Sequence, residues 1–150
     1  MIIAIGSDHG GYELKEEIKK HLDARGVAYQ DFGCHSLTSI DYPLVAAEVA
    51  RAVAGGEYER GLLFCGTGIG ISMAANKVKG IRAAACSDYF SAKYTRLHND
   101  ANILCMGGRV VGAGLAAELV DVFLDTEFEG GERHQRRVDQ ISQLETEEKQ

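Results

Sequence analysis

Short apolar runs alternate along the chain with longer segments in which apolar residues recur at helical spacing. This alternation is typical of βαβ units, so it predicts a parallel sheet with helices on both faces. Apart from Arg82, the last three runs are apolar, as expected of strands that are buried on both faces. The predicted strands cover residues 2–6, 27–32, 62–65, 81–86 and 103–106.

Helical stripes fill the intervals between the predicted strands. Leu14, Ile18 and Leu22 form one stripe on the first helix. Further helices are predicted at 44–53, 71–78 and 87–97. The fifth helix carries a stripe of Leu115, Leu119, Val122 and Phe123.

The pattern changes after residue 126. Gly130 and Gly131 interrupt the chain, and Val138, Ile141 and Leu144 mark a last amphipathic helix, at about 131–145, with no strand after it. Its apolar face needs a partner surface, either on the same domain or on a second subunit. We therefore predict one α/β domain spanning residues 1–150, with a C-terminal helix that contributes to a dimer.

The composition is that of one ordinary globular domain, since 45% of the 150 residues are hydrophobic and 25% are charged. The net charge of -6 gives no general attraction to nucleic acid or to an anionic membrane, and the longest apolar stretches are too short to span a bilayer. The start lacks the features of a signal peptide, and the four cysteines have no C-x-x-C spacing. We expect a cytoplasmic protein without a zinc ribbon or structural disulfides.

The most informative segment follows the third predicted strand. Cys65 precedes glycines at 66, 68 and 70, and this alternation lets several backbone N–H groups converge on one point where a helix begins. Such a loop can hold an anion or a developing oxyanion, and a thiol beside it has a lowered pKa, as a base or nucleophile requires. The alternative is a buried cysteine at a strand end, and the glycine array favours the reactive thiol.

Two histidine clusters accompany this loop. Asp8 and His9 follow the first strand, where doubly wound sheets bind ligands, although Asp8 would also suit a helix cap. His98 and Asn99 precede the fifth strand and enter it from the opposite end, so they reach the same site only through a second subunit or a long helix. Taken alone, His98 would equally suit a surface position that closes a helix.

Basic side chains late in the chain suit a phosphate group. Arg109 follows a glycine pair, and Arg133 and Arg137 lie on one face of the last helix, although a solvated helix face is the usual explanation for such a run. The sequence shows no metal-ligand spacing and no cofactor lysine. The set therefore favours proton abstraction beside a carbonyl on a small phosphorylated substrate, without a metal or cofactor.

These motifs resemble, in order and along nearly the whole chain, the ribose-5-phosphate isomerases of the B type, a family that includes galactose-6-phosphate and allose-6-phosphate isomerases. The resemblance implies a Rossmann-like three-layer α/β/α sandwich with a five-stranded parallel sheet. It also implies a homodimer that shares its sites between subunits, with a dimer of dimers left open, and interconversion of D-ribose 5-phosphate and D-ribulose 5-phosphate in the pentose phosphate pathway. The residues that carry the resemblance are 7–11 (SDHGG), 41–43 (DYP), 65–72 (CGTGIGIS), 74–77 (AANK), 98–102 (HNDAN) and 128–131 (FEGG).

The resemblance further implies a role for each site residue. Cys65 corresponds to the base that moves a proton between C2 and C1 through an enediolate, and His98, helped by Asp8, to the residue that opens the furanose ring. Ile71 stands where another branch has a glutamate, so the chain resembles the cysteine-dependent branch. By the same resemblance, the amides that hold the developing oxyanion are those of Gly66, Thr67, Gly68, Ile69 and Gly70. Thr67, which also takes part in catalysis, and Tyr42 line the sugar, and Asn99 is a further substrate contact. The phosphate contacts are His9, Arg109, Arg133 and Arg137.

Two other functions stay open at this point. An isomerase of six-carbon sugar phosphates would differ in pocket volume. A dinucleotide-binding module is the alternative from the residues alone, because Gly66 and Gly68 follow a strand and Asp88 lies about 20 residues further on.

Overall fold

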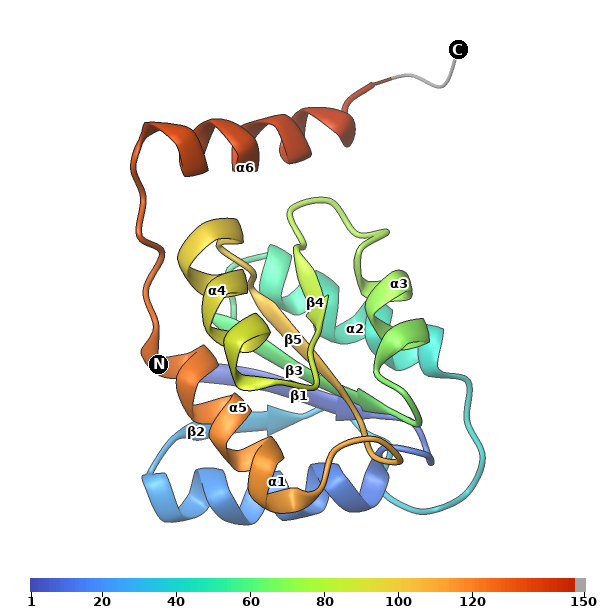
Figure 1. Cartoon of the computed structure of the whole chain (residues 1–150). Coiled ribbons are helices and arrows are strands. Elements are labelled where there is room, and N and C mark those ends of the chain that lie inside the picture. Colours follow the sequence, from blue (N-terminus) through green and yellow to red (C-terminus); the bar gives the residue numbers. More distant parts are fainter. Residues whose placement is uncertain (148–150) are drawn as a thin grey trace.

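Five parallel strands form one sheet in the computed structural model, which describes residues 1–147 (Figure 1). The strands lie side by side in the order β2-β1-β3-β5-β4. Each predicted strand is confirmed, with shifted ends. The bounds are Ile2–Ser7 (β1), Ala28–Asp31 (β2), Arg60–Cys65 (β3), Ala83–Ala85 (β4) and Ile103–Gly107 (β5).

Helices cover both faces of the sheet. α1, α4 and α5 pack on one face and α2 and α3 on the other, so the predicted α/β/α sandwich is confirmed (Figure 1). None of the helices within residues 1–147 is long and apolar enough to cross a membrane. The helices are Tyr12–Arg25 (α1), Tyr42–Ala54 (α2), Ile69–Ala75 (α3), Tyr89–Asn99 (α4), Ala113–Asp125 (α5) and Glu132–Leu144 (α6).

Alternate side chains of the central strands supply two apolar cores, one on each face of the sheet. In β3, Leu62 and Phe64 belong to the core under α1 and α5, and Leu63 and Cys65 belong to the core under α2 and α3. All four residues are buried. The continuous apolar sequence of β3 therefore reflects burial on both faces, as predicted.

The fourth strand corrects one expectation. The sequence predicts burial on both faces for the run at 81–86, but β4 is three residues long, lies at the edge of the sheet and pairs with β5 alone. Ala83 and Ala84 are half-buried and Ala85 is exposed. Alanine fits an apolar pattern without needing a deep core, which explains the error. Leu115 is a second correction: it is 40% exposed, because it lies at the margin of the buried face of α5.

The C-terminal helix α6 follows a turn at Gly130 and Gly131, which both have positive φ angles. Its predicted span is confirmed, and it contacts α4 of the same chain (Figure 1). His134 and Val138 are its buried residues, whereas Ile141 remains 43% exposed. Contacts within residues 1–147 therefore bury only part of the apolar stripe of α6.

A buried ion pair fixes the start of the long loop between β2 and α2. Lys15 of α1 is fully buried, and its Nζ donates to both carboxylate oxygens of Asp31, at 2.7 and 2.9 Å, and to the Cys34 carbonyl. Burial alone would raise the pKa of Asp31, but the Lys15 ammonium, the Gly33 amide and the Lys19 ammonium lower it below its usual value. This loop continues to Tyr42, so the ion pair supports one wall of the cleft described below.

Asp31→Asn should lower the free energy of unfolding by about 3 kcal/mol near pH 7, because it leaves the buried Lys15 ammonium without its carboxylate. The pKa of Asp31 is lower in the folded than in the unfolded chain, so the ion pair contributes fully above about pH 4 and is lost as the pH falls through the folded value. The difference in the free energy of unfolding between wild type and Asp31→Asn should therefore shrink below about pH 4. Urea denaturation at several pH values and one protein concentration measures this free energy for both proteins.

The matched control is Glu118→Gln, which removes an exposed carboxylate from α5. The free energy of unfolding of Glu118→Gln should stay within about 0.5 kcal/mol of the wild-type value at every pH tested. A difference between wild type and Asp31→Asn that is constant across the acid range would contradict the role given to the ion pair.

Candidate active site

The carboxyl ends of β1, β3 and β5 meet at one edge of the sheet. Parallel pairing places Ser7 of β1 beside Phe64 of β3, and Cys65 of β3 beside the last residue of β5. Beyond the strands, the Asp8 amide donates to the Phe64 carbonyl at 3.1 Å and the Gly108 amide donates to the Cys65 carbonyl at 2.8 Å. The three loops that follow these strands therefore emerge side by side, as ligand-binding loops do in doubly wound sheets.

The Cys65 thiol lies at the base of the glycine loop. Cys65 is 4% exposed, and its Sγ accepts a hydrogen bond from the Gly68 amide at 3.0 Å. Gly68 has a φ of 79° as the N-cap of α3, and a Cβ there would lie 2.8 Å from the carbonyl carbon of Met106, so only glycine fits. The hydrogen bond favours negative charge on the sulfur, which a general base requires.

The remaining cysteines, Cys34, Cys86 and Cys105, are also buried. Burial raises the pKa of Cys86 to about 11, and it raises the pKa of Cys105 well above its usual value. The Cys34 thiol donates to the Ser36 carbonyl at 3.2 Å. A thiol whose pKa is raised by burial is a poor base near neutral pH, and this applies to Cys86 and Cys105.

Asp8 and His9 line a cleft of about 610 Å³, together with loop residues 39–44. Asp8 is 7% exposed, and its Oδ1 accepts from the Gly11 amide at 3.1 Å, which closes the turn before α1. His9 Nδ1 accepts from the Ile40 amide at 3.2 Å. A neutral His9 therefore carries its proton on Nε2, from which it can donate to an anion.

Tyr42 and Arg109 lie against the glycine loop. A Cβ at Gly70 would lie 2.7 Å from the Cζ of Tyr42, and a Cβ at Gly66 would lie 3.1 Å from an Nη of Arg109. Within the loop, Thr67 Oγ1 accepts from the Ile69 amide at 3.2 Å. One edge of the sheet thus brings together these predicted site residues: Asp8, His9, Tyr42, Cys65, Gly66, Thr67, Gly68, Ile69, Gly70 and Arg109.

The other predicted residues form a second cluster on α4 and α6. His98 and Asn99 lie at the end of α4, and Arg133 and Arg137 lie on α6. The His98 ring stacks on that of His134, with centroids 4.2 Å apart and planes inclined by 11°. An Nη of Arg133 lies 3.4 Å from His134 Nε2.

The register of the sheet separates the two clusters. The Gly61 amide, near the start of β3, donates to the Asn102 carbonyl at 2.8 Å, whereas Cys65 ends β3. The four-residue step from 61 to 65 spans about 13 Å of strand. The arrowheads of β1 and β3 lie on the side of the sheet away from the linker between α5 and α6 (Figure 1). His98 therefore lies at the opposite end from Cys65, as the strand direction predicts.

His98, Glu129 and His134 offer three metal-ligand atoms within 4.8 Å of one another. The Nε2 atoms of His98 and His134 lie 3.7 and 3.8 Å from Glu129 Oε2. A histidine lone pair lies in the plane of its ring, and two nearly parallel stacked rings direct their lone pairs side by side rather than at one point. The two histidine lone pairs therefore do not point at a common position that a metal ion could occupy.

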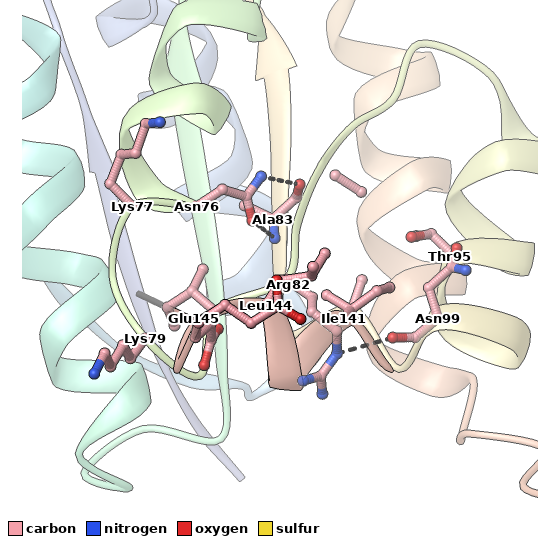
Figure 2. Close-up of a pocket in the computed structure, with 14 residues that line it drawn as sticks. Asn76, Lys77, Lys79, Arg82, Ala83, Thr95, Asn99, Ile141, Leu144 and Glu145 are labelled. Atoms are coloured by element: carbon pink, nitrogen blue, oxygen red, sulfur yellow. Dashed lines mark hydrogen bonds between the residues drawn. The ribbon is translucent and has the colours of Figure 1, made fainter. Parts of the chain in front are cut away.

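A second hollow, of about 750 Å³, lies between α6, α4 and the segment around β4 (Figure 2). Arg82 lines it and donates through Nε to the Asn99 carbonyl at 2.9 Å, and the Asn76 amide group bonds the backbone of Ala83. Among its lining residues, Asn99 alone belongs to the predicted site. We therefore place the chemistry in the smaller cleft beside Cys65.

A family of known proteins matches nearly the whole chain. The family described as Ribose/Galactose Isomerase matches residues 3–141. The chain belongs to this family. The fold and the family expected from the sequence motifs are thus confirmed.

Individual members of the Ribose/Galactose Isomerase family align with the chain from end to end. Ribose-5-phosphate isomerase B of Escherichia coli (strain K12) is 54% identical over 143 residues, which are 95% of each chain. A structure of ribose-5-phosphate isomerase B from Clostridium thermocellum is 55% identical, with a TM-score of 0.95, over 97% of this chain and 98% of that one. A structure of the enzyme from Mycoplasma genitalium, with bound ribulose-5-phosphate, is 42% identical, with a TM-score of 0.92. The match covers 98% of this chain and 97% of that one.

The dinucleotide-binding alternative does not fit this Ribose/Galactose Isomerase fold. Asp88 caps α4, because its Oδ1 accepts from the Ser91 amide at 2.7 Å. It follows β4, which β5 separates from β3. The acidic residue of a dinucleotide site ends the strand next to the one that carries the glycine loop. Asp88 is therefore too far along the sheet to bind a ribose held at Gly66.

The second cluster contains two residues that the sequence analysis does not single out. His134 lies one helical turn before Val138, so it extends the apolar stripe of α6 backward, and this spacing is a signal that could have found it. Glu129 lies within the motif at 128–131, but the resemblance assigns it no role. Its position depends on how the linker folds onto α4, where its amide donates to the Leu97 carbonyl at 3.1 Å.

Proposed function

We propose that this member of the Ribose/Galactose Isomerase family interconverts D-ribose 5-phosphate and D-ribulose 5-phosphate. The observation that carries the proposal is the Cys65 sulfur, which accepts from the Gly68 amide in the glycine loop. Tyr42, which lines the same cleft as Asp8 and His9, lies against this loop. The five-carbon substrate is supported by the ribose-5-phosphate isomerases B of Escherichia coli and Clostridium thermocellum, which are 54% and 55% identical to the chain. Relatives at lower identity include a galactose-6-phosphate isomerase subunit, at 38%, and a D-erythrulose-4-phosphate isomerase, at 44%.

The isomerisation begins with the open-chain aldose. The Cys65 thiolate removes the proton from C2, and the electron pair of that C–H bond forms the C1–C2 double bond of an enediolate with its charge on O1. The proton of O2 then moves to O1, C1 takes the proton back from the thiol, and the C2 carbonyl of the ketose forms. One base thus serves both carbons in turn.

The backbone amides of the glycine loop donate to different groups. The Gly68 amide donates to the sulfur and the Ile69 amide to Thr67 Oγ1, so the Gly66, Thr67 and Gly70 amides are the donors we assign to the enediolate oxygen. Because Thr67 Oγ1 accepts from the loop, its own O–H proton is free to point at O1 and O2. Thr67 is therefore suited to pass the proton between these oxygens.

Ring opening and phosphate binding require both clusters. Opening the furanose breaks the bond from C1 to the ring oxygen, while O1 loses a proton and the ring oxygen gains one; Asp8 and His98 are the groups we assign to these transfers. His9 and Arg109 supply phosphate donors from the cleft. Arg133 and Arg137 supply further donors from α6, and Asn99 a contact to the sugar.

We infer that two copies of the chain complete each site, with the α4–α6 edge of one copy facing the Cys65 cleft of the other. Within one chain the two clusters lie at opposite edges of the sheet. Large apolar side chains are exposed beside both, including Leu44 and Ile69 near the cleft and Phe90 near His98, as on surfaces that a partner covers. A two-fold symmetric dimer then forms two equivalent sites.

Cys65→Ala should abolish exchange of the C1 protons of ribulose 5-phosphate with solvent deuterium, because the base assigned to the protons on C1 and C2 is removed. The dissociation constant of the sugar phosphate should change by less than about three-fold, since the phosphate donors are untouched. Proton NMR measures the exchange, and calorimetric titration measures the binding. Cys86→Ala, which removes a buried thiol outside the cleft, is the control and should turn over normally. Full exchange in Cys65→Ala would refute the assignment of the base.

His98→Asn should slow the conversion of ribose 5-phosphate by about a hundred-fold, because this substrate is mainly cyclic and its ring must open. The C1 exchange of ribulose 5-phosphate should stay near the wild-type rate, because the phosphate on its C5 oxygen prevents furanose closure. Coupled turnover and NMR exchange give the two rates. His21→Asn, which changes a histidine paired with Asp121 away from both clusters, is the control. Equal losses in the two assays would argue against a ring-opening role.

A further inference from the structure

The His98 ring contacts aromatic neighbours on both α4 and α6. The Tyr94 ring, one helical turn earlier on α4, has its centroid 4.9 Å away at an interplanar angle of 75°. Tyr94 in turn stacks on Phe90, with centroids 4.1 Å apart. One face of His98 is covered by the nearly parallel ring of His134, with centroids 4.2 Å apart. Its imidazole plane is therefore set by contacts with both α4 and α6.

His134 is itself held in a neutral form. It is 8% exposed, and Arg133 Nη2 lies 3.4 Å from its Nε2. Because a guanidinium can only donate, Nε2 of His134 is the acceptor. Burial lowers the pKa of His134, and the neighbouring His98 and Arg133 lower it further. The ring therefore offers His98 an uncharged flat surface.

The linker before α6 fixes where His134 meets α4. The Glu129 amide donates to the Leu97 carbonyl at 3.1 Å, one residue before His98. The buried Arg96 donates through Nε to the Thr126 carbonyl at 3.0 Å. Both bonds join the linker to the last turn of α4, so they fix the position of the chain that leads to His134 relative to His98.

We propose that His134 is a positioning residue, which holds the imidazole of His98 by stacking and directs Arg133 by accepting its hydrogen bond. This proposal rests on the proposed function, in which His98 opens the sugar ring and Arg133 binds phosphate. The two parts of this role, stacking on His98 and accepting from Arg133, can be separated by substitution. His134→Phe keeps a flat neutral ring and loses the acceptor, whereas His134→Gln keeps an acceptor and loses the ring.

In His134→Gln, kcat for ribose 5-phosphate should fall about ten-fold with little change in KM, because a catalytic group released from its geometry loses rate steeply. In His134→Phe, kcat should stay within about two-fold of wild type and KM should rise roughly three-fold, because Arg133 loses its orienting acceptor. Deuterium exchange at C1 of ribulose 5-phosphate should be unchanged in both variants. Gln135→Ala, on the exposed side of α6, is the control for a change in this helix.

Two kinetic outcomes would overturn the proposal. An equal loss of kcat in both variants would mean that a ring nitrogen of His134, and not its stacking surface, is needed. A parallel loss of C1 exchange would mean that the substitutions disturb the whole site.

Proton NMR of the His98 ring tests the stack without relying on turnover. The stacked neighbour shields the His98 ring protons, whose signals are assigned by their absence in His98→Asn. The shielding should be lost in His134→Gln and kept in His134→Phe. Unchanged signals in His134→Gln would overturn the proposal, whereas a wild-type protein inactive in both directions would overturn the proposed function and leave the NMR result standing.

Discussion

All strands of the sheet run in the same direction, and this constraint decides where each reactive side chain lies. The carboxyl ends of β1, β3 and β5 place Asp8, the Cys65 loop and Arg109 at one edge. The same register places the segment before β5 beside the start of β3, so the end of α4 lies at the other edge. A single chain therefore carries the two clusters, the cleft half and the helical half of the proposed site, at opposite ends of its strands, which is why we propose that a second copy of the chain completes each site.

Each half-site depends on a different supporting structure. The cleft half rests on the glycine loop, in which the Gly68 amide fixes the sulfur, and on the loop that the buried Lys15–Asp31 pair holds against α1. The helical half rests on hydrogen bonds that fasten the linker before α6 to the last turn of α4. In the proposed mechanism, bond rearrangement at C1 and C2 uses groups of the cleft half, and ring opening uses groups of both halves.

Local sequence patterns predicted most of the cleft half, because the chemistry there follows from neighbours in the chain. The spacing of glycines after Cys65 predicted a loop of converging amides, and strand direction predicted that His98 would lie at the far end. The buried role of Lys15 was not predictable, since a lysine in an amphipathic helix resembles a surface residue until its partner on another strand is known. His134 and Glu129 were missed because their contacts depend on the path of a linker. The exposure of β4 was missed because alanine does not distinguish an edge strand from a central one.

Complementation between Cys65→Ala and His98→Asn is the most direct test of a site shared between two copies. The two variants are unfolded together in urea, refolded as a mixture and assayed for conversion of ribose 5-phosphate. In a two-fold dimer with shared sites, half of the dimers are mixed and each mixed dimer has one intact site, so the mixture should reach about a quarter of the wild-type rate. A mixture no more active than the average of its two components would contradict the shared site.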